Sequence, residues 1–281
     1  MSGVIRPFRW NITQRAQLGR LPDAHPPATY DGFEDELLRC CARVTAFAGE
    51  SDPIFVGRSP EPLFDVLSGL LLDTSWATRL GLLNISLRYS APVTTRQLRA
   101  VRPYFEQVGV TPRQLATRRR PVAFVDVVDS GETLGTLAQI IREWSDVDRV
   151  EWRAVARKIR IVGLTWREKS SPNTFRWQNA QWIKELGLLS IKNVSIDPTF
   201  ATYLAANVPK LSISFPPASW TDESTQKPPR DEEARSALAL AVSLFDLGRK
   251  RETRLRFARE LARQPAMTES WFRSLVLELK R

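Results

Sequence analysis

Residues 126–133 group acidic, hydroxyl-bearing and glycine residues in a pattern that could bind a phosphorylated ligand. The apolar run 122–125 precedes them and is typical of a buried strand, and leucine and isoleucine then recur at helical spacing. The first amides of a helix lack partners within the helix and lie at the positive end of its dipole. A turn between strand and helix is therefore suited to hold a phosphate. Gly131 would let the backbone approach the anion closely, and the hydroxyls of Ser130 and Thr133 could add donors.

Two carboxylates in the same stretch, Asp126 and Asp129, need a separate explanation because they would repel a phosphate. They are compatible with a ligand that also carries hydroxyl groups, a basic nitrogen or a bound Mg²⁺ ion, which prefers oxygen ligands. The residues therefore favour a phosphorylated sugar. An ordinary strand–helix turn with an aspartate cap is the structural alternative.

The segment Val125–Thr133 resembles the ligand-binding motif of the type I phosphoribosyltransferases, which bind 5-phosphoribosyl 1-pyrophosphate (PRPP). The resemblance is nearest to the 6-oxopurine members, which have an aspartate at the position of Asp129. The chain departs from the motif at Val125, where the family usually has its first acidic residue. The resemblance spans roughly residues 33–215 and is sharp only at 121–140.

A second strand–glycine–helix junction follows the apolar stretch 52–57. Ser59 is expected to cap the next helix, with Pro60 as its first residue. The resemblance implies that Gly57, Arg58 and Ser59 form the pyrophosphate loop, where a guanidinium would match phosphate oxygens. The alternative is a surface arginine beside a helix cap.

Three further segments are candidates for the same site. The expected strand 80–87 ends at Arg88 and Tyr89, which the resemblance places in a mobile catalytic loop, although Tyr89 could equally pack on the sheet. The expected strand 159–164 leads to Trp166 and Arg167, where the 6-oxopurine enzymes have a base-reading lysine; stacking or an arginine hydrogen bond could recognise a ring there. For Trp177 and Trp182 we expect structural packing over base stacking.

The resemblance implies a role for each residue of the motif. Asp126 would hold ribose hydroxyls, directly or through water bound to Mg²⁺, and Asp129 would act as general base toward the acceptor. Arg58 would stabilise the departing pyrophosphate. The 5-phosphate would lie in the loop formed by Asp129, Ser130, Gly131, Glu132 and Thr133. Glu132 would contribute only its backbone amide.

These roles imply a phosphoribosyltransferase of nucleotide metabolism, a pentosyltransferase among the glycosyltransferases, with PRPP and Mg²⁺ as ligands and a nucleobase-like acceptor. Catalysis itself is left open. The alternative is a regulator that senses a phosphoribosyl ligand and binds nucleic acid or a protein. That alternative is favoured by Val125, by the replaced lysine, by the net charge of +10 and by the helical tail. A third reading is a structural protein that binds no ligand.

The composition sets broad limits on the class of protein. A hydrophobic content of 43% over 281 residues is enough for a real core. Cys40 and Cys41 are adjacent and are not expected to form a structural disulfide, and the only histidine, His25, lies in a proline-rich loop. Neither a signal peptide nor a long apolar run is present in the sequence, so we expect a cytoplasmic protein without a membrane span.

Strands that alternate with helices predict an α/β domain with a mainly parallel sheet. Loops 57–60 and 126–133 would both leave the carboxyl edge of this sheet and could face one crevice. Arg118–Arg120 is expected to be a solvated strand entrance, with a nucleic-acid patch as the lesser reading. We expect the chain to have four parts: an arm (1–32), a phosphoribosyltransferase-like domain (33–215), a linker (216–230) and a helical module (231–281). The helical module is expected to pack on the domain or on another subunit of a homo-oligomer.

Overall fold

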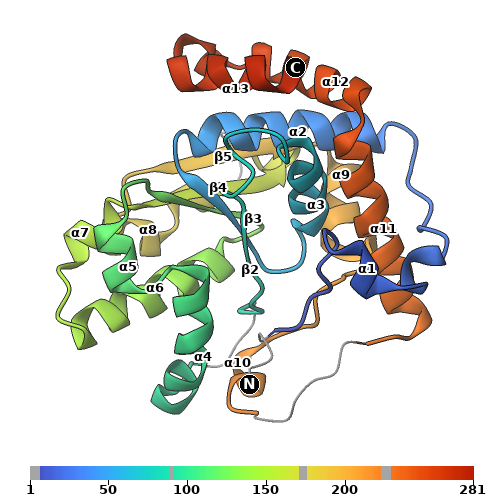
Figure 1. Cartoon of the computed structure of the whole chain (residues 1–281). Helices are drawn as coiled ribbons and strands as arrows, with labels where there is room; N and C mark the ends of the chain where they lie inside the picture. Colours follow the sequence, from blue (N-terminus) through green and yellow to red (C-terminus); the bar gives the residue numbers. More distant parts are fainter. Residues whose placement is uncertain (1–6, 89–91, 171–175, 223–228) are drawn as a thin grey trace.

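The sheet at the centre of the molecule has five parallel strands in the order β2-β1-β3-β4-β5. The computed structural model describes residues 7–88, 92–170, 176–222 and 229–281. Helices cover both faces of the sheet, so the α/β class with a parallel sheet is confirmed (Figure 1). The strands are β1 (Asp52–Val56), β2 (Gly81–Leu83), β3 (Val122–Val127), β4 (Ile159–Trp166) and β5 (Ile191–Ile196).

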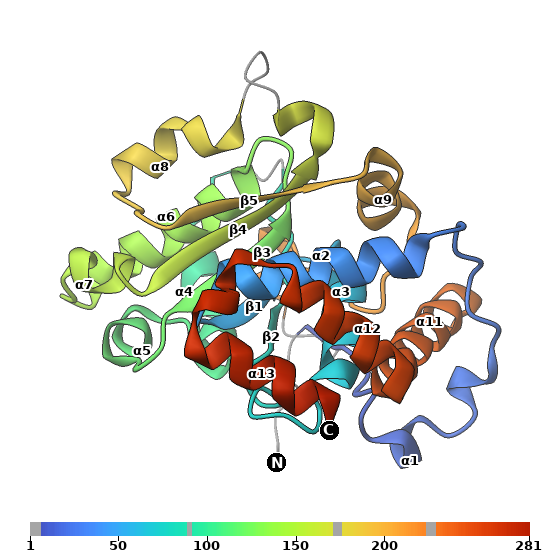
Figure 2. The ribbon, with the colours of Figure 1, turned by 90° about the horizontal axis from the view of Figure 1, so that it is seen from above.

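The helices form layers on the two sides of the sheet (Figure 2). One side carries α2 (Phe33–Ala48), α3 (Glu61–Leu70) and α9 (Pro198–Thr202). The other side carries α4 (Thr95–Val108), α5 (Pro112–Thr117), α6 (Glu132–Val147), α7 (Trp152–Ala156) and α8 (Gln181–Glu185). The remaining helices are α1 (Arg15–Leu18), α10 (Pro217–Trp220), α11 (Glu232–Arg249), α12 (Arg251–Ala262) and α13 (Ser270–Lys280). Among the described helices, none has the length and apolar character needed to cross a membrane.

The apolar run in β3 is continuous because the strand is buried on both faces. Val122 and Phe124 belong to the core on the α6 side, whereas Ala123 and Val125 belong to the core on the α2 side. Successive strand residues point to opposite faces, and helices cover both faces of a parallel sheet. Val125 is fully buried in this way, so the residue that departs from the acidic motif is part of the core.

One expected strand, at residues 80–87, differs from the structure. The stretch 80–87 forms only the short β2, and 211–215 forms no regular strand. Beyond β2 the two stretches bond to one another irregularly: Ser86 N–H donates to Phe215 O at 3.1 Å, and the Asn84 side-chain amide donates to Ile213 O at 2.8 Å. A mixture of backbone and side-chain bonds takes the place of a regular ladder there, and β2 ends at Leu83. The expected cap at Ser59 was also wrong, since Pro60 is the N-cap of α3.

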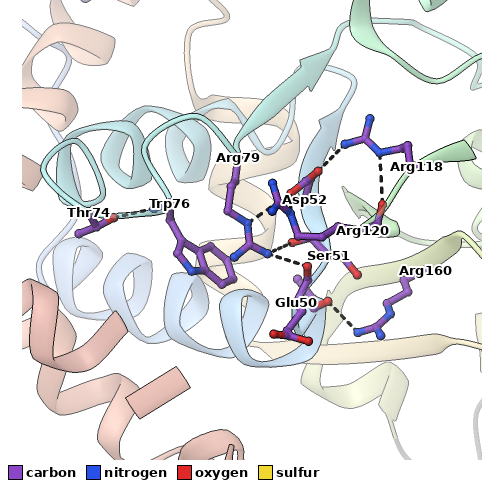
Figure 3. A network of polar contacts seen from close by, with 10 residues as sticks. Glu50, Ser51, Asp52, Thr74, Trp76, Arg79, Arg118, Arg120 and Arg160 are labelled. Atoms are coloured by element: carbon purple, nitrogen blue, oxygen red, sulfur yellow. Dashed lines mark hydrogen bonds and ion pairs between the residues drawn. The ribbon is translucent and has the colours of Figure 1, made fainter. Parts of the chain in front are cut away.

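Arg118 and Arg120 bind the buried carboxylate of Asp52 at the amino end of the sheet (Figure 3). Arg120 Nε lies 2.8 Å from Asp52 Oδ1, and Arg79 Nε lies 3.2 Å from the same atom. Arg79 also donates to the carbonyls of Glu50 and Ser51, at 2.7 and 2.8 Å. Two of the three arginines expected at a solvated strand entrance therefore tie strands together, and both are engaged rather than free to form a patch.

The C-terminal helices pack directly on the α/β layers. α12 and α13 lie over α2 in both views, and Phe257 and Phe272 belong to the same core as the sheet (Figures 1 and 2). α11 lies against α3, where Gly69 and Gly248 bring the two backbones together. The segment expected to be a linker contains α10, whose Trp220 is buried; residues 223–228 lie outside the described part of the chain.

A methyl group at Gly69 is expected to force α3 and α11 apart. Its Cβ would lie 2.0 Å from Phe245 O, a backbone atom that cannot rotate away. We expect Gly69→Ala to lower the free energy of unfolding by about 1–3 kcal/mol in chemical denaturation, despite alanine's better helix propensity. Ser68→Ala, one residue away in the same helix, is the control and should cost clearly less. Equal effects of the two substitutions would contradict the close backbone contact.

Candidate functional site

A cleft of about 260 Å³ opens at the carboxyl edge of the sheet, between the ends of β1 and β3. The helix after β1, α3, lies on one face of the sheet and the helix after β3, α6, lies on the other. Ligands of parallel sheets bind at such a switch point. The structure thus brings the two expected anion loops, 57–59 and 126–133, into one cleft. The other residues that line it are Ile85, Ser86, Leu87 and Arg88 after β2, together with Trp166, Ala205, Lys210 and Ser214.

Asp126 is the buried acid of the cleft, with 7% of its surface exposed. Its Oδ1 accepts a hydrogen bond from Val127 N–H at 2.7 Å. Burial raises the pKa of Asp126 to about 8, against the opposing effects of this hydrogen bond and of the positive charges of Lys210 and Arg88. A carboxyl group in this state is uncharged at neutral pH and can both donate and accept hydrogen bonds, for example with hydroxyl groups of a ligand.

α6 begins directly after Gly131, whose φ of +83° favours glycine. The first bond of the helix runs from Gly135 N–H to Gly131 O at 2.9 Å, and no described side chain caps the helix. A Cβ at Gly131 would lie 3.3 Å from Trp177 Cε3 and 3.4 Å from Trp182 Cζ2. The glycine is therefore required by backbone conformation and by these two tryptophans, a different reason from the expected approach of an anion.

Trp177 and Trp182 pack against the start of α6, as expected, and do not line the cleft. Trp177 is 2% exposed, and its Nε1–H donates to Asn193 Oδ1 at 2.7 Å. A Cβ at Gly163 would lie 2.4 Å from Trp177 Cζ2, so the indole fills the space over β4. Base stacking on Trp177 would require this core contact to break.

Asp129 lies at the exposed mouth of the cleft, where its carboxylate forms an ion pair with Lys169. The Lys169 ammonium also lies 5.1 Å from the ring centroid of Trp166, which lines the cleft. Asp129, Lys169 and Trp166 are thus brought together from β3 and the end of β4. The sequence prediction named Arg167 here, but Arg167 is exposed and is not among the residues that line the cleft.

The loop after β1 contributes Arg58 and Ser59 to the wall opposite α6. Gly57 has a φ of +73°, and a Cβ there would lie 3.4 Å from Ile85 O, so glycine allows β1 to turn sharply beside β2. Arg88 also lines the cleft, whereas Tyr89 lies outside the described residues.

Lys210 lines the cleft and was not foreseen from the sequence. It follows a π-helical turn, Tyr203–Asn207, and its ammonium donates to Leu204 O. Burial lowers the pKa of Lys210 to about 8; Glu61 and Asp126 oppose this effect, and Arg58 adds to it. No sequence pattern around Lys210 predicts that it lies in the cleft, because its position depends on tertiary packing.

The cleft offers few protein ligands for a metal ion. No cluster of three or more histidine, cysteine or acidic residues suited to a metal occurs in the described part of the chain. Asp126 is the only one of its two aspartates without an ion pair to a described residue, since Asp129 is bound by Lys169. Mg²⁺ often takes only one or two carboxylates and completes its shell with ligand phosphates and water. The residues present fit a Mg²⁺ ion that arrives with a phosphorylated ligand.

Comparison of the chain with protein-family models, with curated proteins and with solved structures gives no match.

Proposed function

We propose that the chain binds PRPP with Mg²⁺ in this cleft and transfers the phosphoribosyl group between pyrophosphate and a nitrogenous, nucleobase-like acceptor. The observation that carries the proposal is the convergence of loops 57–59 and 126–133 on one cleft, with the buried Asp126 between them. PRPP has a phosphate at one end, a pyrophosphate at the other and ribose hydroxyls between. The order of groups along the cleft complements that order.

The side chains divide the work as their chemistry allows. The unpaired amides at the start of α6 and the hydroxyls of Ser130 and Thr133 hold the 5-phosphate. Asp126 binds the ribose hydroxyls, and the guanidinium of Arg58 binds the pyrophosphate and stabilises the charge that develops on it as the anomeric bond breaks. Mg²⁺ that arrives with the pyrophosphate would neutralise part of that charge, and Asp126 would offer it an oxygen after losing its proton. Asp129, at the mouth, accepts the proton of the attacking nitrogen once Lys169 has released it.

Asp129→Asn is expected to lower turnover by roughly 10²–10⁴-fold, the usual scale for a lost general base, while the affinity for PRPP changes little. Pyrophosphate release with a panel of nucleobases would measure turnover, and calorimetry would measure PRPP binding. Glu132→Gln is the matched control, because this neighbouring carboxylate lines the cleft but contributes only its amide. Full turnover in Asp129→Asn would remove the general-base role.

A sensor without catalysis is the second candidate, and the contact between Lys169 and Asp129 favours it. A carboxylate held in an ion pair must break that pair to accept a proton. The core position of Val125, in place of the family's first acid, also leaves the site with fewer metal ligands. PRPP binding without pyrophosphate release from any acceptor would select this candidate. Absence of PRPP binding under conditions where the protein is folded would reject both.

A further inference from the structure

Lys210 approaches the cleft from a segment that is far in sequence from both anion loops, and a buried carboxylate holds that segment in place. Glu61, the first residue of α3, is 3% exposed. Its carboxylate accepts hydrogen bonds from Leu211 N–H at 2.9 Å and from Ser212 N–H at 3.2 Å. The residues directly after Lys210 are therefore fixed to the helix that begins at the Arg58 loop.

Lys210 lines the same cleft as Arg58, and Glu61 joins the segment after Lys210 to the helix that follows the Arg58 loop. Glu61 of α3, Arg58 of the loop after β1 and Asp126 of β3 are the charged groups that act on its ammonium. Asp129, by contrast, is exposed and paired with Lys169. Arg58 and Lys210 therefore line the cleft from two segments that Glu61 holds together, and the proposed function assigns the pyrophosphate to the Arg58 loop.

The ammonium of Lys210 has only a carbonyl oxygen, that of Leu204, as its acceptor among the described residues. A neutral carbonyl stabilises an ammonium less than an anionic oxygen does, because charge-assisted hydrogen bonds are about twice as strong as neutral ones. Lysine side chains rotate readily, so an anion in the cleft can replace the carbonyl.

We propose that Lys210 binds the pyrophosphate group of the ligand together with Arg58, and that Glu61 is the positioning residue that holds Lys210 at the cleft. This inference rests on the proposed function, and it extends that function to the segment that brings Lys210 and Ser214 to the cleft. The ammonium leaves Leu204 O and contacts a pyrophosphate oxygen. No covalent bond forms or breaks at Lys210.

Three probes with Mg²⁺ separate the two ends of the cleft: inorganic pyrophosphate, ribose 5-phosphate and PRPP. We expect Lys210→Met to weaken pyrophosphate and PRPP binding by roughly 10- to 100-fold, as for the loss of a hydrogen bond between charged groups. Ribose 5-phosphate binding should stay within about twofold, because its phosphate lies at the other loop. Lys210→Arg should recover much of the affinity for pyrophosphate.

Lys169→Met is the matched control, because it removes a lysine from the mouth and not from the pyrophosphate end. It should leave pyrophosphate affinity unchanged. Equal pyrophosphate affinity of the wild type and Lys210→Met, with PRPP still bound, would overturn the inference and spare the proposed function. A wild-type protein that binds none of the three probes would overturn both.

Proton linkage provides a second readout. Burial lowers the pKa of Lys210 to about 8, so the free protein carries the ammonium below that pH and loses it above. The advantage of the wild type over Lys210→Met should therefore shrink as the pH rises from about 7 to about 9. The comparison between variants cancels the titration of pyrophosphate itself. Glu61→Gln keeps an oxygen acceptor for Leu211 N–H but removes a negative charge that raises the pKa of Lys210. The pyrophosphate affinity of this variant should therefore fall at a lower pH than that of the wild type. A constant ratio between wild type and Lys210→Met across this range would contradict the role of the ammonium.

Discussion

Removal of residues 231–281 is expected to leave a chain that no longer unfolds cooperatively. α11 shares its backbone contact with α3 through Gly69 and Gly248, and α12 packs on α2. Phe257 and Phe272 are fully buried in the core that includes the strands. Loss of a single buried phenylalanine side chain costs about 3–5 kcal/mol, and whole domains are stable by only about 5–15 kcal/mol. The apolar faces exposed by the truncation therefore exceed what the rest of the fold can tolerate.

Thermal and denaturant unfolding of residues 1–230 would measure this effect, together with binding of a dye specific for exposed apolar surface. Two variants of α13 in the full chain provide the control. Phe272→Ala, at a residue with no exposed surface, should cost about 3–5 kcal/mol, whereas Leu277→Ala, 59% exposed, should cost little. A truncated chain that is monomeric, cooperative and as stable as the full chain would show that residues 231–281 are an independent appendage.

The sequence predicts the β3–α6 unit well because local patterns specify it. Val122–Val125 is a continuous apolar run, α6 follows with helical spacing, and Gly131 marks the turn. The same patterns place both loops at one edge of a parallel sheet, since the carboxyl ends of parallel strands lie together. The α/β class and the two sides of the cleft can therefore be predicted from the sequence alone.

Tertiary packing decides what the sequence could not predict. Lys169 pairs with Asp129, and Lys210 lines the cleft that Arg58 also lines, from segments with no periodic pattern. In the sequence Glu61 looks like an ordinary residue of a helix start, yet its burial against residues 211 and 212 fixes a wall of the cleft. Short β2 has a similar cause, because a mixture of backbone and side-chain bonds near Ser86 takes the place of a regular ladder. Such contacts depend on which segments pack together in the fold, and the spacing of residues along the chain does not predict them.

Asp126→Asn is expected to stabilise the fold and to weaken ligand binding. Burial raises the pKa of Asp126 to about 8, and its carboxylate forms no ion pair with a described residue. Between the ordinary aspartate pKa near 4 and about pH 8, the unfolded chain releases this proton while the folded chain keeps it, so the free energy of unfolding falls as the pH rises. Asparagine has the same shape, keeps an acceptor for Val127 N–H and has no proton to lose.

The stabilisation by Asp126→Asn should be near zero at pH 4, grow by at most about 1.4 kcal/mol for each pH unit, and level off above pH 8. Asp65→Asn is the contrasting variant. Burial also raises the pKa of Asp65, to about 7, but Arg9 Nη2 lies 2.5 Å from its Oδ1. Removing that carboxylate strands a buried guanidinium, which typically costs about 3–5 kcal/mol. Asp65→Asn should therefore be clearly less favourable to stability than Asp126→Asn at the same pH, because only Asp65 has a charged partner to lose.

Measuring PRPP binding distinguishes a carboxylate that binds the ligand from one that only lowers the stability of the fold. Asp126→Asn should weaken PRPP binding and reduce its dependence on Mg²⁺, since the ribose hydroxyls and the metal lose the same oxygen. A residue that lowers stability when present and is needed for binding shows the trade-off typical of active sites. If Asp126→Asn were more stable and bound PRPP with unchanged affinity and Mg²⁺ dependence, Asp126 would have no part in the site. In that case the ribose would have to be held by groups nearer the cleft mouth, where Asp129 is the remaining aspartate.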